Sequence, residues 1–287
     1  MVKIKSLLRK VIKVIVPDQV TLANVSVLAP SELLKGRRAL ITGGTSGIGY
    51  AIARSFLQAG ASVAITSRSE ERASLKAKEL MEYVKDGCQV VGIGLDNNCP
   101  SQFESIITKL NMDGRGAIDI LVNNAGIQGA QFGVATEEQY DAVMNTNLKG
   151  AFFLSQAVAR SMVDAGVKGN ILNICSSSSL RPAANGYTLS KVAMKELTEG
   201  MAKSLVPKGI IVNGLAPGPT ATPMLHRDSG KDIKAQFNPL GRCALPEEIA
   251  SMAVILCSSL GQTIVGSVVY MTGGAGILTY EDVKYPF

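Results

Sequence analysis

Tyr187 and Lys191 are the residues whose types and spacing most directly suggest chemistry in this sequence. They lie four positions apart in a segment of helical character, and residues at this spacing share one helix face, about 5–6 Å apart at Cβ. An ammonium beside a phenol favours the phenolate, so the pair can hold and release a proton. Because many helices carry a tyrosine and a lysine at this spacing, the pattern alone also fits a solvated helix face.

Serine hydroxyls lie close to this pair in the sequence. An apolar, β-like run at 171–175 ends at four consecutive serines, of which Ser176, Ser177 and Ser178 come first. A strand that ends beside a helix can present a hydroxyl to the same spot as the tyrosine and the lysine. The three kinds of side chain together predict a proton-transfer site, and the rest of the sequence has to indicate what it acts on.

A glycine-rich segment at 42–49, TGGTSGIG, follows an apolar run and precedes a helical segment. A strand, a glycine-rich turn and a helix N-terminus form an anion site, because backbone N–H groups and the helix dipole face the ligand. The spacing G-x3-G-x-G is neither the common G-x-G-x-x-G nor a P-loop. We interpret it as a dinucleotide-binding turn, the alternative being a turn that serves tight packing alone. The predicted contacts are Gly43, Thr45, Ser46, Gly47, Ile48 and Gly49.

The second predicted strand, 62–67, is expected to end near the adenosine ribose of such a ligand. NAD-binding units usually carry an acidic residue there, whereas an arginine accommodates the 2′-phosphate of NADP. Here the strand ends in Ser67 and Arg68, which could hydrogen-bond and pair with a phosphate dianion. The sequence therefore favours NADP over NAD. The alternative is that Arg68 is a surface arginine and that Glu70 or Glu71 reaches the ribose.

Composition and charge limit the class of protein. Residues 1–38 hold eight basic and two acidic residues, so the net charge of +6 arises there and the rest of the chain is neutral overall. The main domain thus gives no support for nucleic-acid binding. Five cysteines without a C-x-x-C pair predict a reducing, cytoplasmic location and no metal site. The only histidine, His226, lies in a polar segment that does not favour a Ser-His-Asp mechanism.

Residues 1–16 have the pattern of a short, basic amphipathic helix that ends at Pro17. Their apolar run is too short and too charged to cross a bilayer. Two interpretations stay open: the helix lies peripherally on an anionic membrane surface, or it docks its apolar face on its own domain or on a neighbouring subunit. We therefore divide the chain into an N-terminal arm, 1–37, and a single domain, 38–287.

From residue 38 onward, short apolar runs alternate with helical stretches. Uninterrupted apolar strands in such an alternation predict a buried parallel sheet with helices on both faces. The expected fold class is α/β, a doubly wound Rossmann fold with a seven-stranded parallel sheet. The predicted strands are 38–42, 62–67, 89–95, 118–123, 170–175, 210–215 and 267–271. The predicted helices include 47–59, 70–84, 137–163, 187–205 and 246–258.

Five motifs occur in the order in which one family has them. They are Thr42-Gly43-x3-Gly47-Ile48-Gly49, Asn123-Asn124-Ala125-Gly126, Asn147 within a helix, Tyr187-x3-Lys191, and Pro217-Gly218-x3-Thr222. On these motifs the chain resembles the short-chain dehydrogenase/reductase family over about residues 36–276, including its 3-oxoacyl-[acyl-carrier-protein] reductases. Each motif alone is moderate evidence, whereas five in order are specific.

The resemblance implies hydride transfer between a nicotinamide and a carbonyl or alcohol carbon. Ser176 would orient the carbonyl oxygen, Tyr187 would give or take its proton, and Lys191 would assist the tyrosine and hold the nicotinamide ribose. Asn147 would anchor a water that links Lys191 to solvent, the alternative being a helix-kink residue bonded to backbone.

The resemblance also implies cofactor contacts beyond the glycine-rich turn. The alternatives are a strand cap for Asn124 and a turn residue for Thr222. The loop between Ser176 and Tyr187 is shorter than is usual in the family, so Ser177 or Ser178 could supply the hydroxyl instead. The implied contacts are Asp96 with the adenine amine, and Asn124, Ala125, Gly126, Tyr187, Lys191, Pro217, Gly218 and Thr222.

Substrate information is expected in the segment 219–241, which looks like a mobile lid. The resemblance makes a 3-oxoacyl thioester, free or carrier-bound, the first expectation, and a sugar, polyol or other small carbonyl compound the alternative. A hypothesis of another class is a non-catalytic nucleotide-binding scaffold that docks through its arm. The resemblance also implies a homo-oligomer, a tetramer or dimer, in which helices 137–163 and 187–205 form one contact.

Overall fold

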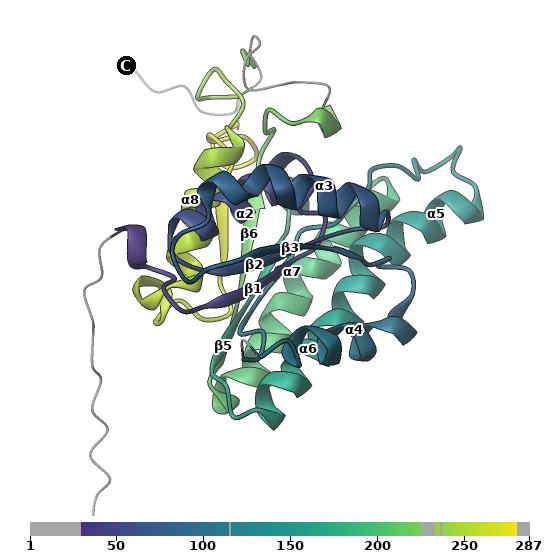
Figure 1. Cartoon of the computed structure of the whole chain (residues 1–287). Helices are drawn as coiled ribbons and strands as arrows, with labels where there is room; N and C mark the ends of the chain where they lie inside the picture. The colour runs from purple at the N-terminus through teal and green to yellow at the C-terminus, as the bar shows by residue number, and fades with distance from the viewer. Residues whose placement is uncertain (1–29, 115, 226–232, 236–237, 280–287) are drawn as a thin grey trace, which may run out of the picture.

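The computed structural model describes residues 30–114, 116–225, 233–235 and 238–279. Within them, seven strands form one parallel sheet in the order β3-β2-β1-β4-β5-β6-β7 (Figure 1). This confirms the predicted doubly wound α/β fold. The strands are β1 (Arg38–Ile41), β2 (Ser62–Ser67), β3 (Val90–Gly94), β4 (Ile120–Asn123), β5 (Gly169–Ile174), β6 (Ile210–Pro217) and β7 (Val268–Met271).

Helices connect the strands and cover both faces of the sheet. They are α2 (Gly47–Gln58), α3 (Glu70–Leu80), α4 (Phe103–Asn111), α5 (Glu137–Met144), α6 (Gly150–Asp164), α7 (Gly186–Leu205) and α8 (Pro246–Cys257). Two short 3₁₀ turns matter for the site, namely η5 (Ser177–Leu180) and η7 (Pro223–Leu225). No helix in the described part of the chain is long and apolar enough to cross a membrane.

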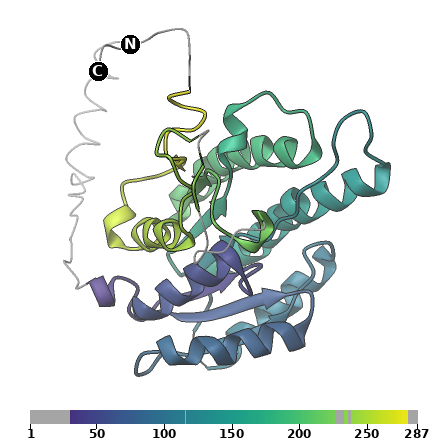
Figure 2. The ribbon, with the colours of Figure 1, turned by 90° about the horizontal axis from the view of Figure 1, so that it is seen from above.

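The apolar side chains form two main cores, one on each face of the sheet. Figures 1 and 2 show the helices that cover these two faces. On one face, α2 and α8 pack together over the sheet, with Phe56 and Ile249 fully buried between them and the strands. On the other face, α4, α6 and α7 bury Phe103, Met162 and Ala202. Because strand residues alternate between the faces, Leu40 faces the second core while Ile41 faces the first.

The helix predicted at 137–163 is divided in the structure. A π-helical turn, η4 (Asn145–Lys149), separates α5 from α6. Single π turns inside α-helices often mark functional sites. The side chain of Asn147 in this turn is 1% exposed and binds the backbone of Ile127, so a contact between distant segments accompanies the break.

The strand order reverses between β1 and β4, which are hydrogen-bonded neighbours. In open parallel sheets, ligands bind in the crevice outside the carboxyl ends of the strands at such a switch point. The glycine-rich turn follows β1, and the segment Asn124–Gly126 follows β4. The topology therefore places both segments at one crevice.

The domain core extends beyond the boundary predicted at residue 38. Leu34 is fully buried in the core, and its backbone N–H donates a 2.9 Å hydrogen bond to the carbonyl of Ala59. The end of the predicted arm is thus part of the domain. The amphipathic segment predicted at 1–16 lies outside the described residues.

Candidate active site

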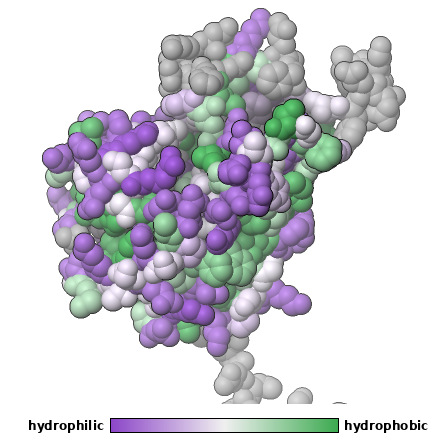
Figure 3. Space-filling model, turned by 90° about the vertical axis from the view of Figure 1, so that its right-hand side faces the viewer, coloured by the Kyte–Doolittle hydropathy of each residue, from purple (hydrophilic) through white to green (hydrophobic). Residues whose placement is uncertain are grey.

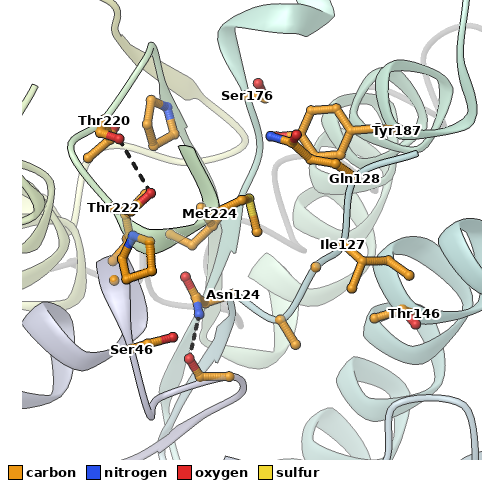
Figure 4. A pocket seen from close by; sticks show the side chains of 18 of the residues that line it. Ser46, Asn124, Ile127, Gln128, Thr146, Ser176, Tyr187, Thr220, Thr222 and Met224 are labelled. Atoms are coloured by element: carbon orange, nitrogen blue, oxygen red, sulfur yellow. Dashed lines mark hydrogen bonds between the residues drawn. The ribbon is translucent and has the colours of Figure 1, made fainter. Parts of the chain in front are cut away.

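A cavity of about 740 Å³ lies at the carboxyl ends of the strands (Figure 4). It brings together the predicted cofactor turn and the predicted catalytic group, which are far apart in the sequence. Two predicted residues, Gly49 and Asn147, do not line it. The predicted residues that line it are Gly43, Thr45, Ser46, Gly47, Ile48, Ser67, Arg68, Asp96, Asn124, Ala125, Gly126, Ser176, Tyr187, Lys191, Pro217, Gly218 and Thr222.

The turn after β1 needs its glycines. Gly43 has φ +62°, and a Cβ there would lie 3.0 Å from the Cα of Ala125. The amide of Asn124 donates hydrogen bonds to the carbonyls of Thr42 (2.9 Å) and Gly43 (3.1 Å), and so holds the turn against the end of β4. Gly49 packs behind the turn, where a Cβ would clash with that same amide nitrogen. Asn124 therefore fixes the shape of the turn besides lining the cavity.

The N-terminus of α2 fits an anionic ligand. Its N-cap Ser46 makes no side-chain capping bond, whereas Ser69, Thr136 and Asn185 cap their helices. The Ser46 hydroxyl and the first backbone N–H groups of α2 therefore have capacity for a ligand on the cavity side. With the close approach that the turn glycines allow, these groups suit the diphosphate of a dinucleotide.

Two arginines line the cavity near the end of β2. Arg68 follows the strand directly, as predicted, and Arg72 follows one helical turn later in α3. Arg72 was not predicted, although its i+4 spacing from Arg68 is a signal that the sequence contains. Glu70 and Glu71, the alternative ribose contacts, are exposed and do not line the cavity. The charge at this end thus suits a phosphate.

Tyr187 and Lys191 lie near each other at the start of α7. The Asn185 side chain caps this helix by accepting a hydrogen bond from Thr188 N, at 2.8 Å, which sets the helical register of the pair. Lys191 Nζ lies 5.9 Å from the ring centroid of Tyr187 and donates a 2.6 Å hydrogen bond to the carbonyl of Ile174. Among the described residues, none hydrogen-bonds the Tyr187 hydroxyl, so it is available to a ligand.

Ser176, Ser177 and Ser178 all line the cavity, but their hydrogen bonds differ. Ser176 Oγ accepts hydrogen bonds from the backbone N–H (3.1 Å) and the hydroxyl (2.9 Å) of Ser178. Two accepted bonds leave the Ser176 hydroxyl its own proton to donate, whereas the Ser178 proton is already used. Figure 4 shows Ser176 and Tyr187 at the same end of the pocket, away from Ser46. The geometry therefore favours Ser176 over Ser178 as the donor to a carbonyl oxygen.

Asn147 lies behind the cavity wall. Its Oδ1 accepts a hydrogen bond from Ile127 N (2.8 Å), and its Nδ2 donates to Ile127 O (2.9 Å) and Ser190 Oγ (3.0 Å). This geometry is that of the alternative interpretation, a helix-kink residue bonded to backbone. A Cβ on Gly126 would lie 3.3 Å from Asn147 Oδ1 and 3.8 Å from Lys191 Nζ, so a side chain at this position would crowd the asparagine and contact the lysine.

The segment after β6 covers the cavity opposite Tyr187 (Figure 4). The Thr222 hydroxyl donates a 3.3 Å bond to Thr220 O within the turn, while its methyl group packs over Gly47. Met224 and Leu225 line the cavity from η7, within the segment predicted to determine the substrate. Much of the rest of that segment lies outside the described residues.

Several residues that line the cavity were not predicted from the sequence, because only the tertiary structure brings them there. Gln128, Arg181 and Cys243 are examples. Cys175 also lines the wall, but burial raises the pKa of its thiol to about 11, so it is neutral near pH 7 and unsuited to nucleophilic chemistry.

Comparison with known proteins identifies the class. The family model for short chain dehydrogenases matches residues 37–232, which is more than half of the chain. This protein belongs to the short-chain dehydrogenase family and is an oxidoreductase, as its motifs predicted.

Individual relatives cover nearly the whole domain. Gluconate 5-dehydrogenase of Gluconobacter oxydans is 36% identical over 84% of this chain and 95% of its own length. The 3-oxoacyl-[acyl-carrier-protein] reductase of Aquifex aeolicus is also 36% identical, over 84% of this chain and 98% of its own. The crystal structure of gluconate 5-dehydrogenase from Burkholderia cenocepacia with NADP and tartrate is 34% identical, with TM-score 0.77, over 87% of this chain and 98% of its own. The relatives thus agree in class and differ in named substrate.

Proposed function

We propose that this protein is an NADP(H)-dependent oxidoreductase that transfers hydride between the nicotinamide and a carbonyl or alcohol carbon of a small molecule. The observation behind the proposal is that one cavity holds the glycine-rich turn together with Ser176, Tyr187 and Lys191. A dinucleotide on the turn would extend along the cavity to the catalytic group.

NADP(H) is the proposed cofactor because of the charge at the end of β2. Arg68 and Arg72 both line the cavity there, and no acidic residue of α3 does so. A 2′-phosphate pairs well with guanidinium groups, and the solved relative from Burkholderia cenocepacia contains NADP. Asp96, at the end of β3, lines the same part of the cavity and is the proposed contact to the adenine.

When bound, the nicotinamide supplies or accepts the hydride. Ser176 donates a hydrogen bond to the substrate oxygen and orients it, which stabilises the negative charge that develops there during reduction. Tyr187 donates the proton to that oxygen in reduction and removes it in oxidation. Lys191, held by Ile174 O, keeps a positive charge beside the tyrosine ring.

For the finer substrate we consider two classes. A 3-oxoacyl thioester is supported by the resemblance to 3-oxoacyl-[acyl-carrier-protein] reductases and by the apolar side chains of Met224 and Leu225 at the cavity. A sugar or sugar acid is supported by the gluconate 5-dehydrogenase relative and by polar lining residues such as Gln128 and Thr220.

A carbonyl panel tests the proposal. NADPH oxidation is followed spectrophotometrically with 3-oxoacyl thioesters, keto sugars, keto acids and simple aldehydes, and NADP⁺ reduction with the matching alcohols. We expect turnover with at least one class and a lower KM for NADPH than for NADH. NADPH binding without turnover of any member of the panel would instead favour the non-catalytic scaffold.

We also propose that the protein is a homo-oligomer. Apolar side chains remain exposed on two helices, among them Phe152 and Phe153 of α6, whose rings pack edge to face, and Leu189 of α7. Figure 3 shows a face on which apolar patches lie between hydrophilic areas. Burial of such side chains against a second copy would stabilise a dimer. Analytical ultracentrifugation tests the proposed association. A monomer at about 10 µM protein would contradict the homo-oligomer.

A further inference from the structure

The substrate end of the cavity holds a charged side chain that the proposed chemistry does not use. Arg181 lines the cavity together with Ser176, Ser178 and Tyr187, and it is exposed. Its guanidinium makes no hydrogen bond and no ion pair with any described residue. An unpaired cation therefore borders the space in which a substrate has to lie.

The other charged residues that line the cavity already have a proposed role. Among its described lining residues, four are basic and one is acidic. Arg68, Arg72 and Asp96 lie near the carboxyl ends of β2 and β3, where the adenosine part of the cofactor is proposed to bind. Lys191 is hydrogen-bonded to Ile174 O beside the catalytic tyrosine. Arg181 is thus the basic group of this lining that is left for the substrate.

The backbone that presents Arg181 is held by hydrogen bonds and packing. Arg181 N donates to Ser178 O at 3.1 Å, which closes the turn η5. The Ser179 hydroxyl donates to Ser176 O (2.7 Å) and lies 3.2 Å from the Tyr270 hydroxyl on β7. The same turn contains Ser178, which hydrogen-bonds Ser176. Arg181 and Ser176 therefore lie on one segment that these hydrogen bonds hold in place. An anion bound to Arg181 thus has a defined position relative to Ser176.

We propose that Arg181 binds an anionic group of the substrate, so that this enzyme acts on carbonyl compounds or alcohols that carry a carboxylate or a phosphate. A guanidinium binds either oxyanion through two parallel N–H···O bonds. Gluconate, for which one relative is named, and tartrate, present in the solved relative, are both carboxylates. The proposal rests on the proposed function and adds the substrate class to it.

Pairs of substrates that differ in one anionic group test this assignment. For a carboxylate, 5-keto-D-gluconate is compared with L-sorbose, which has CH₂OH in place of the carboxylate. For a phosphate, acetoacetyl-4′-phosphopantetheine is compared with acetoacetyl-pantetheine. The readout is the ratio of kcat/KM for the acid to kcat/KM for its neutral partner, measured for the wild-type enzyme, Arg181→Gln and Arg181→Lys.

We expect the wild-type ratio to exceed one for one of the two pairs, and that pair identifies the anion. Arg181→Gln should lower this ratio at least about tenfold, which corresponds to about 1.4 kcal/mol. Arg181→Lys should lower this ratio less, because lysine keeps the positive charge but cannot bind an oxyanion in the bidentate geometry of a guanidinium. Because Arg181 is exposed, 0.5 M NaCl should reduce the wild-type ratio as well.

Arg160→Gln is the matched control for long-range attraction. Arg160 lies on α6, its side chain is 62% exposed, and it does not line the cavity. The variant removes the same charge and should leave the ratio unchanged. An equal fall of the ratio in both variants would attribute the preference to net charge and overturn the assignment of Arg181.

Direct binding separates a failure of this inference from a failure of the proposed function. Isothermal titration of the NADP-loaded protein with D-gluconate and with inorganic phosphate should show about tenfold weaker binding of one of them in Arg181→Gln. Turnover with an unchanged ratio, or binding that Arg181→Gln does not weaken, overturns the inference alone. Loss of all turnover on the carbonyl panel overturns the proposed function, while the titration still decides the role of Arg181.

Discussion

Lys191 Nζ donates a 2.6 Å hydrogen bond to the backbone carbonyl of Ile174, the last residue of β5. This bond ties the helix that holds Tyr187 to the strand that ends next to Ser176. Lys191 is only 5% exposed, and a buried ammonium is costly unless it is hydrogen-bonded. The bond therefore stabilises the charge of the lysine and, at the same time, joins the two elements that carry the proposed catalytic residues.

Tyr187→Phe should abolish turnover and leave the cofactor site intact. The variant removes only the hydroxyl, for which the described residues offer no hydrogen-bond partner, so the fold should lose little. We expect kcat to fall by about 10³-fold or more and the Kd for NADPH, measured by fluorescence titration, to change less than about threefold. Tyr140→Phe, an exposed position on α5 outside the cavity, is the control. Full activity of Tyr187→Phe would contradict the proposed mechanism.

Single alanine variants of the serines should separate their roles. Ser176→Ala removes the proposed donor to the substrate oxygen, so kcat should fall about 10²- to 10³-fold. Ser178→Ala removes only a hydroxyl that supports Ser176 Oγ, so a loss of about fivefold is expected. Ser177→Ala removes a hydroxyl that neither donates to the substrate oxygen nor supports Ser176 Oγ in this proposal. If Ser178→Ala were the more damaging change in single-turnover kinetics, the assignment of Ser176 would have to be reversed.

Gly126→Ala should disturb the space next to Lys191 while changing the fold little. The added Cβ would lie 3.3 Å from Asn147 Oδ1 and 3.8 Å from Lys191 Nζ, where a water could bridge the two groups. We expect kcat to fall about tenfold, with a loss of less than about 2 kcal/mol in the free energy of unfolding. Unchanged kcat would count against a water relay at this point.

Gly200→Ala provides the control for that variant. Gly200 lies on the same helix as Lys191, and a Cβ there would meet nothing within 4 Å. It should raise the free energy of unfolding by about 0.5–1 kcal/mol, because alanine favours a helix interior over glycine, and leave kcat as it is.

The fold was predictable because each strand is a short apolar run bounded by turns. Predicted and observed strands agree to within about two residues, the usual uncertainty of element ends. The break in the helix predicted at 137–163 was not predictable, since it accompanies bonds between Asn147 and Ile127, twenty positions earlier. No local pattern reports a contact over that distance.

The site was predictable where a motif fixes both residue type and position. The glycine-rich turn and the Tyr187–Lys191 pair therefore came together as expected. Arg181 was missed because lining a cavity depends on tertiary position. Arg72 was missed although its i+4 spacing from Arg68 was a signal in the sequence. The choice among the serines also needed coordinates, since the hydrogen bonds within the turn distinguish Ser176 from Ser178.

Removal of the guanidinium groups near β2 should change the cofactor preference. Arg68→Ala and Arg72→Ala should each raise the KM for NADPH, by about tenfold per lost phosphate contact. The KM for NADH should change less than about twofold, because NADH has no 2′-phosphate. Steady-state kinetics with both cofactors check this. An equal rise for NADPH and NADH would show that these arginines do not recognise the 2′-phosphate.

Glu248→Gln should destabilise the fold at neutral pH and progressively less in acid. Arg242 binds the Glu248 carboxylate through two hydrogen bonds of 2.8 Å, and with the Leu245 N–H it lowers the pKa of Glu248 from 4.5 to about 2. A depressed pKa means that the carboxylate stabilises the fold above its unfolded pKa, near 4.5, and that this contribution is lost as the pH falls through about 2.

Since the Glu248 side chain is 39% exposed, solvent screening limits the expected loss at pH 7 to about 1 kcal/mol. The difference between wild type and variant should fall by about half by pH 3. Urea unfolding at fixed protein concentration, at pH 7, 4 and 3, measures it. Glu104→Gln is the control, because the Glu104 carboxylate is 72% exposed and, among the residues that the structure describes, forms an ion pair only with Arg160, so its effect should be small throughout. A Glu248→Gln difference that stayed constant down to pH 3 would show that the lost stability comes from shape and capping, not from the charge.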